Sequence, residues 1–228
     1  MKYLLLCAAL GLAAASYPAA APFDQYRYAR VQDEIAAARS AAPPSISANA
    51  GVLVLGDRGF DEVAKSKNGF VCFVERSWFS GFEDPEFWNP KLRSPNCFNP
   101  AAVHSVLPQY LAWTQWVLAG ATKQQMMQRA RAEFAAHHFT GPDPGAMTFM
   151  LSKQGYVSDA AAGPWLPHVM FFVPRGQTAL FGANLAGSPF IGSETSAIEP
   201  TLVLVPVRHW SDGSPAPMPN SQEHHHSS

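Results

Sequence analysis

Carboxylates and histidines that could transfer protons or hold a metal are spread along the chain. Glu75 ends an apolar run, Glu133 and His137 stand four residues apart in a helical pattern, and His104 and His168 lie elsewhere. Their spacing matches neither HExxH nor another tight set of zinc ligands. If the five side chains converged, they would form a metal-assisted or acid–base hydrolase, and we keep this as an alternative hypothesis for the function.

Nucleophilic catalysis has no recognisable motif in this sequence. A GxSxG elbow is missing, and no cysteine is left unpaired to act with a histidine once export and disulfide formation are considered. We therefore predict no catalytic residue, no bound metal and no cofactor.

The N-terminus is typical of a secretory signal peptide. Lys2 supplies a positive charge, an apolar run extends from Leu4 to Ala15, and Ala13 and Ala15 provide the A-x-A pattern for cleavage after Ala15. An uncleaved anchor is the alternative, but the run is shorter than the roughly 20 apolar residues that a span needs. We expect residues 1–15 to be removed and the protein to be periplasmic or secreted.

The cysteines fit that compartment. Cys7 lies in the signal peptide, which leaves Cys72 and Cys97 to form one disulfide. A redox-active pair would need a CxxC spacing, so we predict a structural bond that tethers the following loop to the sheet.

The net charge gives no electrostatic reason to expect a highly charged partner. Without Lys2 the mature chain has 15 basic and 17 acidic residues, a balance close to zero. Neither nucleic acid nor an acidic membrane is favoured as a partner. Charged residues make up 14% of the sequence and aromatic residues 12%, which favours a small apolar ligand or a protein partner.

The loop that follows residue 77 combines aromatic rings with Glu83, Asp84 and Glu86. Such a loop could stack on a sugar, bind a cation or contact a protein; alternatively, its rings simply complete the core. With residues from later elements it gives the binding site that we predict, lined by Trp78, Phe82, Trp88, Trp113, Met150, His168 and Met170.

Hydrophobic patterns predict the elements that would position these residues. A helix is expected over 23–42, and two further helices start near Pro108 and at Thr122, the second with a Thr122–Gln125 capping box. A disordered tail is expected over 211–228. Strands are predicted over 51–56, 69–78, 146–152, 167–174 and 201–207.

This order predicts a single α+β domain over residues 51–207. Its core would be a five-stranded antiparallel sheet with a helical hairpin crossover between strands 2 and 3. The element order resembles that of PAS-like and profilin-like modules, which is an analogy of fold only.

Several segments together resemble a family of exported bacterial proteins of unknown function: NGFVCFVERSW (68–78), PNCFNP (95–100), MTFMLS (147–152), PHVMFFVP (167–174) and GANL (182–185). The resemblance implies export and a single domain, but no activity. We predict a non-enzymatic ligand- or partner-binding domain. Besides the hydrolase, a structural role in an envelope assembly is the other alternative, with the 23–42 helix as its docking element.

Overall fold

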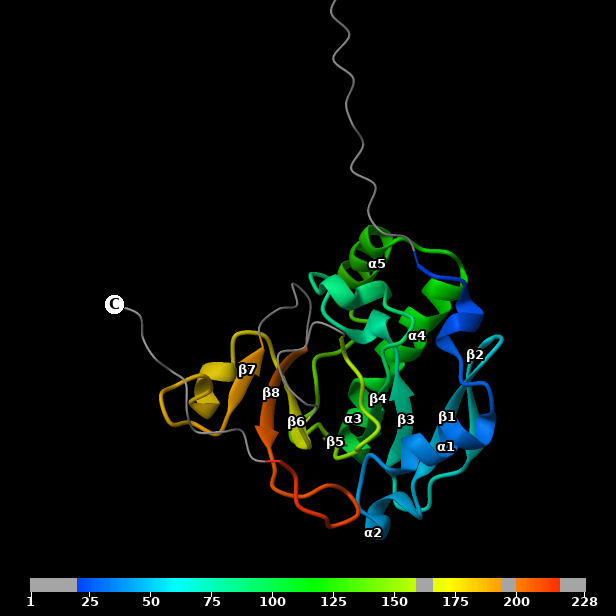
Figure 1. Cartoon of the computed structure of the whole chain (residues 1–228). Helices are drawn as coiled ribbons and strands as arrows, with labels where there is room; N and C mark the ends of the chain where they lie inside the picture. The colour runs from blue at the N-terminus through cyan, green and yellow to red at the C-terminus, as the bar shows by residue number, and fades with distance from the viewer. Residues whose placement is uncertain (1–19, 159–165, 194–199, 218–228) are drawn as a thin grey trace, which may run out of the picture.

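One mixed β-sheet runs through the whole molecule. The computed structural model describes residues 20–158, 166–193 and 200–217. Within these ranges eight strands pair in the order β2-β1-β3-β4-β5-β6-β8-β7, from the right of Figure 1 to its left, and only β1 and β3 are parallel. The strands are β1 (Gly51–Gly56), β2 (Gly59–Ala64), β3 (Val71–Glu75), β4 (Ser94–Phe98), β5 (Met147–Met150), β6 (His168–Val173), β7 (Ile191–Ser193) and β8 (Thr201–Pro206).

The predicted five-stranded antiparallel sheet of PAS- or profilin-like order is therefore wrong, although the α+β class is right. Five of the strands match the predicted ones, but β2, β4 and β7 were not predicted. β2 faces solvent with Asp61 and Glu62, β4 contains Pro95 in a stretch that resembles a loop, and β7 has only three residues. Each of the three therefore lacks the alternating β-branched or aromatic pattern that marks a strand.

Strand β2 also explains the parallel pair. Gly56 lies opposite Gly59, so Asp57 and Arg58 form a two-residue turn between β1 and β2. Gly59 has a φ of 113°, a conformation that favours glycine. Because β2 leads the chain back to the start of β1, β3 enters beside β1 in the same direction, whereas the predicted sheet was antiparallel throughout.

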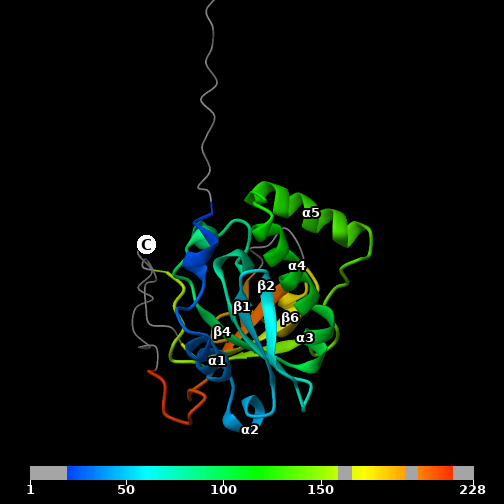
Figure 2. The same cartoon turned by 90° about the vertical axis from the view of Figure 1, so that its right-hand side faces the viewer.

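Helices cover both faces of the sheet. Figure 2, seen from the β2 edge, shows α1 on one side and α3 and α4 on the other. The helices are α1 (Val31–Arg39), α2 (Pro44–Ser47), α3 (Pro100–Ser105), α4 (Leu107–Leu118) and α5 (Lys123–Ala135), with 3₁₀ turns η1 (Phe23–Tyr26), η2 (Ser77–Phe79), η3 (Pro85–Trp88) and η4 (Thr178–Phe181).

The expected helix 23–42 consists of η1, an extended segment and α1. The two later helices match their predicted positions. Gly120 follows α4 with a φ of 73°, and the Thr122–Gln125 capping box is present at the start of α5.

Two apolar clusters fill the space between the sheet and its helices. The larger lies under α3, α4 and α5 and contains Trp78, Phe73 and Phe98. The smaller lies under α1, where Ala37 and Ala38 pack on Val52 and Val74. Small alanines let α1 approach the sheet closely, so this part of the predicted helix 23–42 packs on the sheet of its own domain.

A buried ion pair links α1 to the end of β3. Arg76 and Glu34 are almost fully buried, and their side chains are 2.7 Å apart. Arg76 also donates to the carbonyl oxygens of Tyr26 and Val74, and Glu34 accepts the Leu55 N–H. The pair therefore joins η1, α1, β1 and β3 at one point.

At the opposite edge of the sheet, the side chain of Asn184 closes strand β7. Its amide donates to the Gly192 carbonyl at 3.0 Å and its oxygen accepts the Gly192 N–H at 3.1 Å. Asn184 has a φ of 62°, and a Cβ on Gly192 would lie 3.0 Å from that of Ala183. The outward-facing backbone groups of Gly192 are thus already paired.

No helix in the described ranges is long and apolar enough to cross a membrane. The predicted signal peptide (1–15) lies outside the described residues. Of the expected tail, residues 211–217 are described: Ser211 N–H donates to the Leu151 carbonyl and Asp212 pairs with Lys153.

Candidate functional site

Glu75 is a buried acid on the helix-covered face of the sheet. Side chains alternate along a strand, so Glu75 shares a face with Phe73 and Val71, whereas Cys72 and Val74 face α1. Only 8% of Glu75 is exposed, and its Oε1 atom makes no hydrogen bond to any described residue. One oxygen of this buried acid therefore lacks a donor within the described part of the chain.

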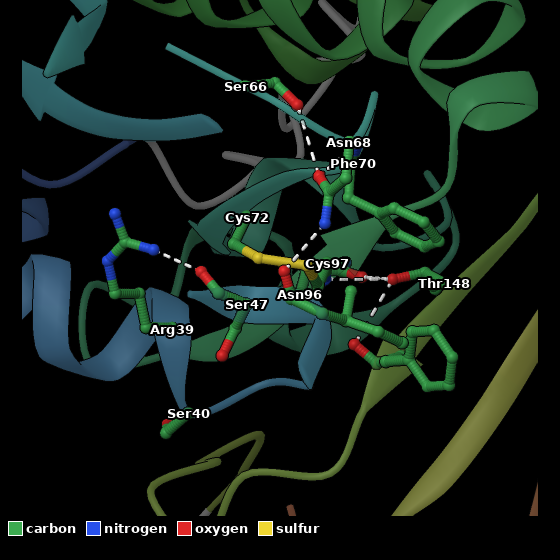
Figure 3. Close-up of a disulfide and its surroundings, with 12 residues drawn as sticks. Arg39, Ser40, Ser47, Ser66, Asn68, Phe70, Cys72, Asn96, Cys97 and Thr148 are labelled. Carbon is green, nitrogen blue, oxygen red and sulfur yellow. Dashed lines mark hydrogen bonds between the residues drawn. A yellow bond between two sulfur atoms is a disulfide. The ribbon is translucent and has the colours of Figure 1, made fainter. Parts of the chain in front are cut away.

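Asn96 on β4 lies beside it, and a chain of hydrogen bonds fixes the direction of its amide. The Cys97 N–H donates to Thr148 Oγ1 at 3.1 Å, and the Thr148 hydroxyl donates to Asn96 Oδ1, as the dashed lines in Figure 3 show. Because Oδ1 accepts from Thr148, the NH₂ group of Asn96 is the end left to interact with Glu75. Nδ2 is fully buried without a hydrogen bond of normal geometry.

Tyr110 on α4 is the third polar residue of the site, after Glu75 and Asn96. Its hydroxyl hydrogen-bonds the Glu75 carboxyl, and burial next to that carboxyl raises the pKa of Tyr110 well above its usual value. The ring of Tyr110 stacks on Phe79 at 4.4 Å and on Trp113 at 6.0 Å. Trp113 adds another buried polar atom without a partner, Nε1.

Burial raises the pKa of Glu75 to about 8, against the opposing effect of the nearby Tyr110 hydroxyl and Asn96 amide. The carboxyl is therefore mostly protonated at pH 7. A neutral acid of this kind can donate or accept a hydrogen bond, and it becomes a carboxylate when a cation approaches.

This pKa predicts a pH-dependent stability. Between about pH 4.5 and 8 the folded protein keeps the Glu75 proton while the unfolded chain loses it, so the free energy of unfolding falls as pH rises, by up to about 1.4 kcal/mol per pH unit. Urea unfolding of wild type and Glu75→Gln at pH 5, 6, 7 and 8 gives the free energy of unfolding of each protein at each pH. The effect of Glu75 is the difference between the two slopes of this free energy against pH. The control Glu62→Gln, on the exposed face of β2, should keep the wild-type slope; equal slopes for all three proteins would contradict the assignment.

The disulfide between Cys72 and Cys97 is present, on the opposite face of the same two strands. The two residues lie directly opposite each other in the β3–β4 register, and both are fully buried under α1 (Figure 3). Cys97 belongs to β4 itself, so strand pairing as well as the disulfide holds the two ends of the aromatic loop together.

The residues predicted to line a binding site fall into two groups. Trp78 and Phe82, from the aromatic loop, are buried in the core, where Trp78 packs on Tyr26 and Phe82 on Trp113. Trp88 is half-buried and packs against that core. In this structure the rings of the loop contact one another and α4.

The second group belongs to the surroundings of Glu75 and Asn96. Met170 lies opposite Thr148, and Met150 lies opposite His168, on the same face of β5 and β6. His168 Nδ1 donates to the Leu166 carbonyl at 2.8 Å, and burial lowers the pKa of this histidine. Together with Trp113, these residues lie on the face that carries the unpaired polar atoms.

The five residues of the hydrolase hypothesis lie on separate elements. His104 is exposed on α3 and pairs with Asp143. α5 ends at Ala135 and His137 adopts a φ of 58°, so Glu133 pairs with His138 instead. Among the described residues there is no group of three or more His, Cys, Asp or Glu side chains arranged for a metal.

Sequence reasoning named Glu75 but missed Asn96, Thr148 and Tyr110. Inward alternation of Val71, Phe73 and Glu75 was a usable signal for the acid. Asn96 carried none, because its strand has the composition of a loop, and a single tyrosine in an apolar helix is usually a core residue.

The resemblance to exported bacterial proteins remains a prediction that rests on short segments. Comparison with protein-family descriptions, with curated proteins and with solved structures finds no match for this chain.

Proposed function

We propose that this protein is an exported, non-enzymatic domain that binds a small ligand beneath α4, at Glu75, Asn96 and Tyr110. The observation that carries the proposal is a pair of buried atoms, Glu75 Oε1 and Asn96 Nδ2, that form no hydrogen bond with the residues that the structure describes. Each such atom costs about 1–3 kcal/mol, and native proteins keep few of them unless a ligand, ion or water completes the bonding.

The surroundings of these atoms suit a ligand with an apolar body. Tyr110, Trp113, Met150 and Met170 are buried members of one apolar cluster on the same side of the sheet. Mostly apolar sites with a few convergent polar groups are typical of small-molecule binding. The fixed amide of Asn96 would orient the polar group of the ligand.

Export is part of the proposal. The buried Cys72–Cys97 bond supports it, since structural disulfides persist mainly in oxidising compartments. A mature protein whose mass does not correspond to removal of an N-terminal segment would contradict export.

A matched set of small molecules tests the binding function. We expect at least one member of a set of butyl and benzyl amines, alcohols and carboxylates to raise the melting temperature of the wild type. Tyr110→Phe removes the hydroxyl that contacts Glu75 and should weaken binding about 10-fold or more, the range for a hydrogen bond to a charged group.

Trp116→Phe on the same helix is the matched control, because Trp116 packs on Phe139, away from Glu75. It should bind like the wild type. If no compound stabilises the wild type, or if Tyr110→Phe binds as well as Trp116→Phe, the proposed site is wrong.

A further inference from the structure

We infer that the ligand of this site is a small organic cation, an ammonium group on an apolar body, whose charge the Glu75 carboxylate neutralises. This inference rests on the proposed binding function and adds the chemical class of the ligand.

Among the described residues, no cation lies beside the Glu75 carboxyl. The groups that act on it are Tyr110 from α4 and Asn96 from β4, and neither is positively charged. On the same face of the sheet, the neighbours of Glu75 are Phe73 on β3 and Ser94, which lies opposite on β4. The next residue, Arg76, points to the other side of the strand, where Glu34 and two carbonyl oxygens already engage its guanidinium.

The two polar groups that act on Glu75 both favour its charged form. The Tyr110 hydroxyl and the Asn96 amide lie near the carboxyl, and both lower its pKa. The chain from the Cys97 N–H through Thr148 prevents the Asn96 amide from turning its oxygen toward Glu75. The site is therefore built to hold a carboxylate, and desolvation keeps it protonated only while no cation is present.

Aromatic rings surround Tyr110, whose hydroxyl acts on Glu75. Tyr110 is the centre of an aromatic group, with Phe79, Phe98 and Trp113 at centroid distances of 4.4, 5.4 and 6.0 Å. Aromatic faces attract ammonium groups, more strongly when water is excluded. Phe79 and Trp113 cover the two faces of the Tyr110 ring, so the rings act by excluding water from the carboxyl. A carboxylate ligand would instead place a second negative charge beside Glu75.

Proton linkage distinguishes a cation from the other classes of ligand. When an ammonium binds, Glu75 gives its proton to the buffer, which at pH 7 amounts to about 0.9 proton per site for a pKa of about 8. A neutral alcohol would release almost none, and a carboxylate would take up protons. The Kd of an amine should fall about tenfold per unit between pH 6 and 7 and level off above pH 8.

The experiment is titration calorimetry of the full-length mature protein with benzylamine, benzyl alcohol and benzoate at pH 7, in buffers of different ionisation enthalpy. We expect benzylamine to bind with release of close to one proton. Glu75→Gln should lose at least about tenfold in benzylamine affinity and release no proton, while Glu62→Gln behaves like the wild type. Circular dichroism melting checks that each variant is folded.

The outcomes separate this inference from the proposed function. Binding of benzyl alcohol or benzoate that depends on Tyr110, with no benzylamine binding, would keep the site and overturn the cationic ligand. Benzylamine binding without proton release, or undiminished in Glu75→Gln, would overturn it as well. If none of the three compounds binds the wild type, both the inference and the proposed function fail.

Discussion

Replacement of Arg76 by methionine is expected to lower the free energy of unfolding by about 3–5 kcal/mol, as found when one partner of a buried ion pair is removed. The change leaves the Glu34 carboxylate without a counter-ion in a dry environment. It also leaves the carbonyl oxygens of Tyr26 and Val74 without their donor. Urea unfolding monitored by tryptophan fluorescence measures the loss.

Two variants control this prediction. Arg30→Met removes an exposed pair with Asp33 and should cost less than about 1 kcal/mol. The double variant Glu34→Met/Arg76→Met should lose less than Arg76→Met alone, because no charge is then left buried. If Arg76→Met costs no more than Arg30→Met, the buried pair does not stabilise the docking of α1.

Removal of the disulfide should have the second largest effect. The bond closes 25 residues, for which the chain-entropy relation gives about 3.5 kcal/mol, so Cys72→Ala/Cys97→Ala should lose roughly that amount. The β3–β4 pairing keeps the strands together in the folded state, so the effect arises mainly in the unfolded chain.

The dependence on urea tests that explanation. Without the cross-link the unfolded chain expands and exposes more surface, so the m-value should rise as the free energy falls. Wild type unfolded in a reducing agent should reproduce the double variant. A loss below about 1 kcal/mol with an unchanged m-value would contradict the argument.

Local patterns predicted the elements that have a strong signal of their own. The apolar runs GVLVLG and PHVMFFVP become β1 and β6, and the capping box starts α5 where it was expected. The disulfide followed from the export signal and the cysteine count. In each case a few neighbouring residues contain the information.

Tertiary pairing decided the remainder. β4 contains Pro95 and Asn96 and becomes a strand because β3 and β5 flank it. The presence of β4 changes the topology. The helices lie between β4 and β5, whereas the prediction placed them directly between the strands 69–78 and 146–152. The candidate site depends on that same strand, so the sequence could suggest Glu75 but not the neighbours that give it a function.

The paired Gly192 backbone has a consequence for how the folded protein behaves at high concentration. An open sheet edge can recruit strands from other molecules and start ordered aggregates. At β7 the Asn184 amide already occupies the Gly192 hydrogen-bonding groups, and at the opposite edge β2 exposes the charges of Asp61 and Glu62. The Asn184 amide therefore protects the middle of one edge as a paired strand would, and like charges disfavour strand addition at the other. The folded protein should for both reasons resist edge-to-edge association.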